Sequence, residues 1–219
     1  MNCKALWAEF IGTFTLIFIG VGAIASDHLS GGKLGLTGIA LAHGLAIAVM
    51  VSATAAVSGG HLNPAVTIGL LSARKIDVAN AIGYVCAQCL AAIVAAFSIK
   101  QCIPAHALAA VGMGTPALGN GITATMGLLT EIILTFFLVF VVYGTAVDKR
   151  APKVGGLFIG LTVALDILMG GPISGAAMNP ARHLGPALLG GGLDNIWIYW
   201  VGPLSGGILA GLVYKNILE

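Results

Sequence analysis

Two segments of the chain repeat a short run of asparagine, proline and alanine. The two copies are Asn63-Pro64-Ala65 and Asn179-Pro180-Ala181. Asparagine caps helix N-termini well and proline suits the first helical position, so each run predicts the start of a helix. A helix N-terminus carries about half a positive charge, and an asparagine amide donates hydrogen bonds. Two such ends facing a narrow pore would repel cations and hydronium ions and still bind the oxygen of a neutral molecule.

Four further ionisable residues lie in or beside apolar runs. Glu9 and Glu131 open similar six-residue segments at an offset of 122 (131 − 9). Carboxylates within a membrane mark proton or ion pathways by default, so these two are candidate proton carriers. His43 lies alone in an apolar run, where an imidazole either binds a permeating molecule or hydrogen bonds to a neighbouring helix. His61 stands two residues before the first asparagine.

The composition identifies the environment of these residues. Of the 219 residues, 58% are hydrophobic and 8% are charged, and the mean hydropathy is +1.01. A soluble domain carries about 25% charged residues, so an ordinary soluble enzyme, a disordered tail and a nucleic-acid-binding protein with a basic surface are excluded. High hydrophobicity together with 32 glycines is typical of closely packed transmembrane helices. The sequence therefore predicts a multi-pass integral membrane protein in the lipid bilayer.

Catalytic and metal-binding motifs are absent from the sequence. The chain contains neither G-x-S-x-G nor H-E-x-x-H. Its four cysteines are too few and too scattered for a disulfide scaffold or a metal site, and Cys86 and Cys89 are most simply small packing residues in an apolar run. We therefore predict no enzymatic activity, no cofactor, no bound metal and no nucleic-acid partner.

Charged residues divide the chain into uncharged runs of membrane-spanning length. Residues 10–26, 78–99 and 195–214 each fit one helix, since about 20 residues cross the hydrocarbon of a bilayer. The run 34–73 is longer, and a glycine-rich segment before Pro64 interrupts it. A helix over 64–73 would be about 15 Å long, which is half a membrane. We predict a full span at 36–57 and then a re-entrant half-helix, because irregular backbone at that depth is tolerated only inside protein or beside water.

The same arrangement recurs in the second half of the chain. Ser58–Ala65 matches Ser174–Ala181 at a constant offset of 116 (179 − 63). We predict two repeats, about 1–104 and 118–219, within a single channel domain, 1–219. Each repeat has three full spans, and this odd number inverts the second copy in the membrane and brings the two half-helix N-termini together. The predicted fold is an all-α membrane protein with six transmembrane helices and two re-entrant half-helices in an inverted 3+3 repeat.

Lysine and arginine predict the orientation in the membrane. With both termini in the cytoplasm, seven of these residues lie inside, and two, Lys33 and Lys100, lie outside. The seven are Lys4, Arg74, Lys75, Lys149, Arg150, Lys153 and Lys215. Because cytoplasmic loops carry the excess of positive charge, both termini are predicted to be cytoplasmic.

Arg182 directly follows the second Asn-Pro-Ala run. It falls in the first turn of the predicted half-helix, where the helix dipole disfavours a cation. Placing an arginine at the centre of a membrane helix costs about 2.5–3.5 kcal/mol on insertion scales. The matching residue of the first copy, Val66, is apolar, so the fold does not require a charge there. These points favour a functional role for Arg182.

The chain resembles the aquaporin, or major intrinsic protein, family along essentially its whole length. The resemblance rests on the two Asn-Pro-Ala runs, Arg182, the paired Glu9 and Glu131, Ser58–His61 and Trp197–Pro203. It implies a passive, homotetrameric channel for water and small neutral solutes that excludes protons and ions. It further implies that Glu9 and Glu131 support the re-entrant loops by accepting backbone hydrogen bonds, and that His61 lines the cytoplasmic vestibule.

Four residues form the narrowest point of the pore in that family, and the matching residues here are His43, Ile167, Ala176 and Arg182. This filter looks like that of the tonoplast intrinsic proteins and related ammonia-permeable channels, in which a connector histidine, here His106, joins it. Ile167 and Ala176 would make one wall wide and apolar, while His43 and Arg182 would keep hydrogen-bond donors on the other. The resemblance implies permeation of ammonia besides water, with hydrogen peroxide and urea as further candidates.

Two residues depart from that pattern. Asp166 stands where the tonoplast branch has asparagine. His183 stands where water channels have a small residue and glycerol channels have an aspartate. A carboxylate and an imidazole beside the filter could pair with each other or make permeation depend on pH.

The sequence leaves alternatives for the function and the location. A glycerol channel is the nearest alternative, although glycerol channels resemble proline followed by an aliphatic residue where this chain has Tyr199-Trp200. A proton-coupled secondary transporter also fits inverted repeats with interrupted helices and buried acids. For the location, the short termini favour the cell membrane, with a vacuolar membrane as the alternative.

Overall fold

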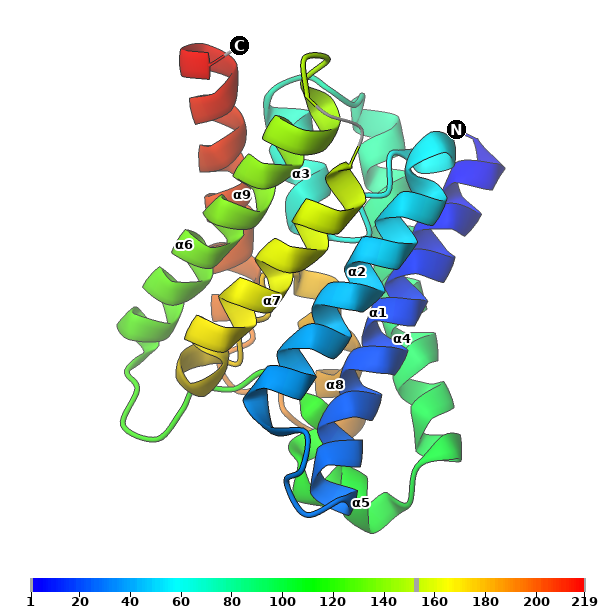
Figure 1. Cartoon of the computed structure of the whole chain (residues 1–219), viewed down its shortest axis with the longest axis vertical. Helices are drawn as coiled ribbons and strands as arrows, with labels where there is room; N and C mark the ends of the chain where they lie inside the picture. Colours follow the sequence, from blue (N-terminus) through cyan, green and yellow to red (C-terminus); the bar gives the residue numbers. More distant parts are fainter. Residues whose placement is uncertain (1, 152–153, 219) are drawn as a thin grey trace.

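The computed structural model describes residues 2–151 and 154–218, and within these ranges the chain forms helices and no strands (Figure 1). The elements are α1 (Cys3–Leu29), α2 (Gly35–Ser58), α3 (Pro64–Ser72), α4 (Val78–Cys102), α5 (Ala105–Ala110), η1 (Gly112–Gly114), α6 (Ala124–Val142), η2 (Tyr143–Val147), α7 (Gly155–Ser174), α8 (Pro180–Gly190), α9 (Ile198–Val213) and η3 (Tyr214–Leu218). The turns η2 and η3 are π-helical and extend α6 and α9. The predicted all-helical class is confirmed.

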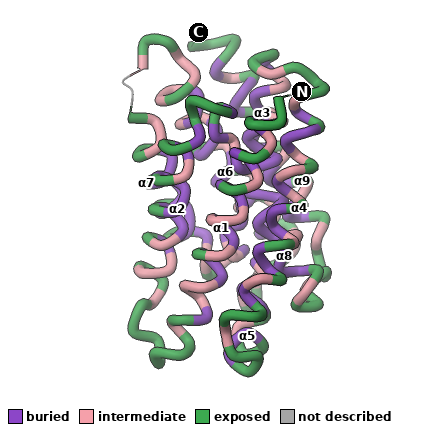
Figure 2. The backbone as a smooth tube through the Cα atoms, turned by 90° about the vertical axis from the view of Figure 1, so that its right-hand side faces the viewer, coloured by how far each residue is buried: buried purple, intermediate pink, exposed green. Residues whose placement is uncertain are grey.

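Six helices of the described chain are long and apolar enough to cross a membrane. They are α1, α2, α4, α6 with η2, α7 and α9 with η3, and each contains 20 to 27 residues. At 1.5 Å per residue, even the shortest reaches about 30 Å, the thickness of the hydrocarbon core. Their inner faces are buried and their outer faces are exposed to varying degrees (Figure 2). The six predicted spans are therefore present.

The short helices α3 and α8 lie toward opposite ends of the bundle (Figure 1). They contain 9 and 11 residues, too few to cross a bilayer. α3 ends at Ser72, one residue before the end predicted from the sequence. Each begins with the predicted asparagine cap and a proline in its first turn. The two half-helices therefore run outward from the middle of the bundle.

Both termini lie at the same end of the bundle, as an even number of spans requires (Figure 1). The basic residues predicted to be cytoplasmic that the structure describes lie on elements or loops at this end: Lys4, Arg74, Lys75, Lys149, Arg150 and Lys215. Lys153 lies outside the described residues. Lys33, in the loop between α1 and α2, and Lys100, in the last turn of α4, lie at the opposite end. We call these ends the terminal end and the opposite end.

Glycine allows the helices to approach closely. A Cβ atom on Gly160 of α7 would lie 2.2 Å from the carbonyl oxygen of Gly44 on α2. A Cβ atom on Gly185 of α8 would lie 2.3 Å from the carbonyl oxygen of Ala92 on α4. No side chain fits at either contact, and close backbone packing of this kind holds membrane helices together. Glycine therefore permits close contact both between two full spans, α2 and α7, and between the half-helix α8 and the span α4.

Polar contacts at the terminal end fix α6 and α9 against the half-helix α3. The Tyr143 hydroxyl donates to the carbonyl of Gly69 on α3 at 3.0 Å, and its ring stacks on Tyr214. The Tyr214 hydroxyl donates to the Asp148 carboxylate at 2.9 Å, and Arg150 pairs with the same carboxylate. Hydrogen bonds from Arg150 hold the pKa of Asp148 well below its usual range. The carboxylate therefore stays ionised, and this contact persists, throughout the physiological pH range.

Candidate functional site

Asparagine caps organise the N-termini of the two half-helices. The Asn63 side-chain oxygen accepts a hydrogen bond from the Ala65 N–H at 2.8 Å. The Asn179 oxygen accepts from the N–H groups of Ala181 and Arg182 at 3.0 and 3.1 Å. Each cap satisfies backbone donors that a helix start otherwise leaves free. Both carboxamide oxygens accept bonds within their own half-helix, so only the amide N–H groups can bind other parts of the protein or a permeating molecule.

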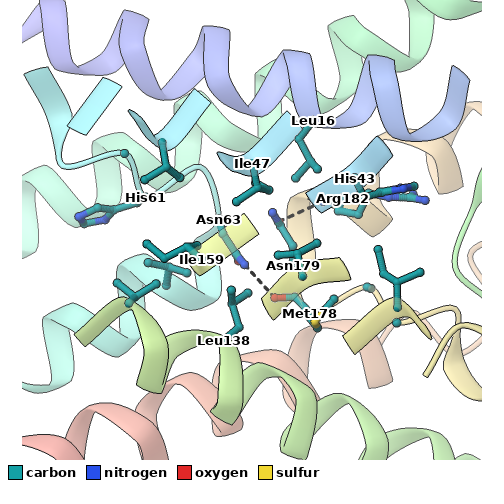
Figure 3. A pocket seen from close by; sticks show the side chains of 18 residues that line it. Leu16, His43, Ile47, His61, Asn63, Leu138, Ile159, Met178, Asn179 and Arg182 are labelled. Atoms are coloured by element: carbon teal, nitrogen blue, oxygen red, sulfur yellow. Dashed lines mark hydrogen bonds between the residues drawn. The ribbon is translucent and has the colours of Figure 1, made fainter. Parts of the chain in front are cut away.

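The two re-entrant loops are joined through these amides. The Asn63 amide nitrogen donates to the Met178 carbonyl at 2.8 Å (Figure 3), and the Asn179 amide nitrogen, in the second loop, donates to the Leu62 carbonyl at 3.0 Å. Leu62 and Met178 both adopt the left-handed region, with φ of 52° and 50°. Because an amide nitrogen carries two hydrogens, each asparagine keeps one donor for a passing molecule. The sequence predicted this donor but not the bond that holds each amide in place.

Glu9 binds the first re-entrant loop. It is fully buried on α1. Its Oε1 accepts from the Ser58 hydroxyl at 2.6 Å and the His61 N–H at 2.9 Å. Its Oε2 accepts from the Leu62 N–H at 2.6 Å and the Gln88 amide at 2.8 Å. All four bonds use the carboxylate as an acceptor, which is the geometry of loop support rather than of a proton carrier.

Glu131 binds the second loop in the same way. It is fully buried on α6. Oε1 accepts from the Ser174 hydroxyl at 2.6 Å and the Ala177 N–H at 2.9 Å, and Oε2 accepts from the Met178 N–H at 2.7 Å. Met178 is also the residue whose carbonyl accepts from Asn63. Met178 therefore binds Glu131 through its N–H and the opposite loop through its carbonyl, and Leu62 links Glu9 to the opposite loop in the same way.

Sequence reasoning missed three residues that complete these networks. The Tyr84 hydroxyl donates to the Ser58 carbonyl and the Tyr199 hydroxyl donates to the Ser174 carbonyl, both at 2.9 Å. Gln88 connects Glu9 to α3. The two tyrosines are 115 residues apart (199 − 84), close to the offset of 116 between the Asn-Pro-Ala runs. That near match is the signal that could have identified the tyrosines.

A narrow cavity runs through the point where the half-helices meet (Figure 3). It leaves about 30 Å³ for the centres of water-sized molecules, whereas one enclosed water needs about 10–15 Å³ by the same measure. Its lining is Leu16, His43, Ile47, Val51, Gly60, His61, Asn63, Val66, Leu138, Val142, Ile159, Val163, Ile167, Ala176, Ala177, Met178, Asn179 and Arg182. Most of these side chains are apolar, so the few polar groups determine which molecules are held in transit.

The four predicted filter residues lie at one end of this cavity. His43, Ile167 and Arg182 line both the narrow cavity and a wider one of about 290 Å³ at the opposite end of the bundle. Ala176 lines the narrow cavity. The structure does not bring His106 to them, because it is exposed on α5 and lines neither cavity. Residues 114–117, further along the connector, line the wider cavity instead.

His43 presents an acceptor rather than the donor expected from the sequence. Its Nδ1 lies 2.9 Å from the Ile39 carbonyl, which can only accept, so Nδ1 carries a hydrogen. In the neutral imidazole, Nε2 is then the unprotonated nitrogen, and it is buried without a hydrogen-bond partner among the described residues. A Cβ atom on Gly20 would lie 2.3 Å from Nε2, so the ring rests directly on the α1 backbone.

Gly20→Ala is expected to displace the His43 ring and lower the permeability of the channel to water. A methyl group there overlaps Nε2, and overpacking of this kind costs about 1–3 kcal/mol, enough to change the filter. Gly22→Ala is the matched control, because its new Cβ would meet Ile99 at an ordinary 3.6 Å. Osmotic water flux into proteoliposomes measures both variants. Equal flux for the two would show that His43 does not depend on Gly20.

Arg182 is the one charged side chain among the described residues that line the narrow cavity. It is 5% exposed, and its Nη1 has no hydrogen-bond partner among the described residues. The neighbouring carboxylate of Glu131 is already occupied by the loop donors. Arg182 lines both the narrow and the wider cavity, and no ion pair among the described residues neutralises its charge.

His61 lies at the other end of the narrow cavity. It also lines a cavity of about 860 Å³ at the terminal end, so it stands where the pore opens toward the predicted cytoplasm. Its Nδ1 lies 3.1 Å from the Thr67 hydroxyl, which itself donates to the Asn63 carbonyl. The ring packs edge-on against Tyr84. These contacts hold the His61 ring at the place where the narrow cavity meets the wide one.

The structure does not bring Asp166 and His183 into the pore. Neither residue lines the narrow cavity, and no hydrogen bond joins them. His183 is fully buried and stacks on Tyr199 with ring centroids 4.1 Å apart. Asp166 faces a separate groove between α6 and α7. Among the described residues, no group of three or more histidine, cysteine, aspartate or glutamate side chains could hold a metal ion.

A six-span bundle in which two half-helices meet at a narrow pore defines a transmembrane channel. The profile of the family described as "Major intrinsic protein" matches residues 1–214. The chain is 50% identical to Aquaporin TIP4-4 of Zea mays and 49% identical to Aquaporin TIP4-1 of Arabidopsis thaliana, over 98% of this chain and 86% of each relative. The chain therefore belongs to the major intrinsic protein family, the aquaporins.

A solved structure supports the same assignment. The aquaglyceroporin from Plasmodium falciparum superposes with a TM-score of 0.88 at 28% identity, covering 100% of this chain and 97% of that one. The protein is a channel for water and small solutes and not an enzyme. Family membership argues against the proton-coupled transporter. The buried acids that suggested it, Glu9 and Glu131, bind the re-entrant loops instead.

Proposed function

We propose that the protein is a passive channel for water and ammonia, with hydrogen peroxide and urea as further small neutral solutes. The observation that carries the proposal is the filter, where His43, Ile167 and Arg182 separate the narrow cavity from the wider one. Ile167 gives an apolar wall, and Ala176 adds little bulk. The Arg182 guanidinium can donate hydrogen bonds to a passing molecule, and the His43 ring, whose Nε2 rests on α1 at Gly20, adds bulk beside it.

Ion exclusion rests on two sources of positive potential. The half-helix N-termini contribute about half a charge each at the meeting point, and Arg182 contributes a full charge at the filter. The two remaining amide hydrogens of Asn63 and Asn179 can hold the oxygen or nitrogen of a passing molecule. A single file of water would be oriented by these donors.

The proposal is tested by comparing two fluxes in the same proteoliposomes. Light scattering after an osmotic step reports water, and an internal pH dye reports ammonia entry. Fast flux of both supports the proposal. Fast water flux alone would limit the channel to water. Neither flux, in protein that elutes as a single folded species, would contradict the channel proposal.

Ile167→His is expected to reduce ammonia permeability about tenfold, equivalent to a barrier about 1.4 kcal/mol higher, with a smaller effect on water. The imidazole would fill the apolar side of the filter and replace a wall without hydrogen bonds by a polar one. Ile167→Val is the matched control, because it keeps the wall apolar and leaves space. The ratio of ammonia flux to water flux is the measurement. A ratio unchanged in both variants would mean that Ile167 does not set the preference between ammonia and water.

Glycerol is the second candidate solute. The structural similarity to an aquaglyceroporin favours it. Against it stands Tyr199, whose ring is stacked on His183 and whose hydroxyl is bonded to Ser174, so that this face of α9 is filled. Osmotic recovery in a glycerol gradient distinguishes the two solute ranges, because a glycerol channel lets vesicles swell back after they shrink.

We further propose a homotetramer in the vacuolar membrane. The tetramer is an inference from the family, and native mass spectrometry of the purified channel would test it. The names of the relatives carry the abbreviation of the tonoplast intrinsic proteins, which favours the vacuolar membrane over the cell membrane expected from the short termini. A fluorescent fusion in a plant cell would decide between the two membranes.

A further inference from the structure

The wider cavity beside the filter has mostly apolar walls. It lies at the opposite end of the bundle and offers about 290 Å³ to water-sized molecules. Large apolar side chains from α1, α2, α7 and the connector line it: Ile24, Leu36, Ile39, Val111 and Ile167. The cavity therefore suits a small molecule with an apolar body.

Arg182 is the one charged side chain among the described residues that line this wider cavity. The residue is 5% exposed, and its Nη1 is sealed from water without a partner. Nε and Nη2 make no hydrogen bond to a described residue, and neither atom is sealed as Nη1 is. The Glu131 carboxylate interacts with Arg182 electrostatically, but its oxygens are bonded to the second re-entrant loop. One edge of a buried guanidinium is thus left for a ligand.

The edge formed by Nε and Nη2 matches a carboxylate. Its two N–H groups point in parallel, so both oxygens of one carboxylate can accept from them together. A neutral amide of the same shape would bring one acceptor and would turn its own N–H₂ group toward the second donor. An ammonium group would bring donors alone, and Arg182 would repel it. The cavity therefore favours a small apolar molecule with a single carboxylate.

The narrow cavity beyond Arg182 would not let such an anion pass. It leaves about 30 Å³ for water-sized molecules, and apart from Arg182 no charged side chain among the described residues lines it. An anion moving past Arg182 would give up its partner and its remaining water at the same step, which is strongly disfavoured in apolar surroundings. A carboxylate held at Arg182 would therefore stay there and occupy the path of water.

We propose that the wider cavity binds a small apolar monocarboxylate on Arg182 and that the bound anion blocks water flux, an inference that rests on the proposed function of the channel. The terminal end is a poorer site for the same ligand. Arg74 and Lys75 line the cavity there, but Asp77 lines it as well and adds a negative charge. Arg74 is also exposed, so water and salt screen it.

Butyrate, butyramide and butylammonium are suitable probes, because they share one apolar chain and differ in the charge of the head group. Melting temperatures of the purified full-length channel over a concentration series give the Kd of each probe. Butyrate is expected to bind about 10- to 100-fold more tightly than butyramide, the worth of hydrogen bonds to a charged group, and butylammonium least. Acetate should bind about tenfold more weakly than butyrate, since it lacks two methylenes. Equal binding of butyrate and butyramide, or of butyrate and acetate, would overturn the proposal.

Ala117→Asp and Ala117→Asn form a matched pair that leaves the filter intact. Ala117 is exposed and lines the wider cavity but not the narrow one. The new carboxylate is expected to weaken butyrate binding about three- to tenfold by repulsion, whereas the amide of nearly the same shape should leave it unchanged. Equal Kd values for butyrate in the two variants would overturn the proposal.

Arg182→Val should abolish the preference for butyrate over butyramide, and Arg74→Gln should preserve it. The reverse result would place the anion at the terminal end and overturn the proposal. An Arg182→Val channel that does not fold would be recognised by its melting temperature without ligand, and the Ala117 pair then carries the test.

Water flux into proteoliposomes measures the block. At about ten times its Kd and at constant ionic strength, butyrate should lower the flux on the order of tenfold, and butyramide at the same concentration should not. A fall of the same size in Arg182→Val would indicate an effect outside this site and would overturn the proposal, as would binding without a fall. A channel that conducts no water before butyrate is added would contradict the proposed function instead, and the Kd values would still test the site.

Discussion

Arg182→Val is expected to let small cations and protons leak through a channel that still conducts water. The substitution places in the second repeat the residue that the first repeat already has, Val66. At an effective dielectric constant of about 20, a unit charge about 5 Å from a permeating cation contributes about 3 kcal/mol of repulsion. Its removal should raise cation flux about a hundredfold. The dipoles of the two half-helices remain, so exclusion is weakened rather than abolished.

Arg74→Gln is the matched control for this prediction. Arg74 is also an arginine beside the permeation pathway, but it is exposed in the wide cavity at the terminal end. Water and salt screen its charge there, so no change in leak is expected. Proteoliposomes with an internal pH dye and an imposed potential report both variants. If Arg182→Val leaks no more than Arg74→Gln, the main barrier to cations lies at Asn63 and Asn179 and not at Arg182.

The membrane spans and the half-helices could be predicted because their causes are local. Uncharged runs of about 20 residues fix the spans, and the sequence asparagine-proline fixes the start of α3 and α8. The two copies at a constant offset then require the half-helix ends to meet. The boundaries differed by one residue: α2 runs from Gly35 to Ser58 rather than over 36–57, and α3 ends at Ser72 rather than at 73. Helix ends have no strong sequence signal.

The details of the filter could not be predicted because they depend on contacts between distant segments. The sequence predicts that His43 belongs to the filter. It does not predict that Nδ1 donates to the Ile39 carbonyl or that the ring packs against Gly20. The bond to Ile39 lies within α2, but the contact with Gly20 is not visible without the packing of α1 on α2. His106 shows the same limit. Its motif resembled a filter residue, yet the connector turns so that residues 114–117 reach the vestibule and His106 is exposed.

The largest loss of stability is expected for Glu9→Leu, followed by Glu131→Leu. Leucine would leave four buried donors unsatisfied at Glu9 and three at Glu131. Each unsatisfied donor costs about 1–3 kcal/mol, and a native protein is stable by only about 5–15 kcal/mol. Neither variant should yield folded channel. Size-exclusion profiles of detergent extracts measure this, and a sharp wild-type peak for Glu9→Leu would contradict it.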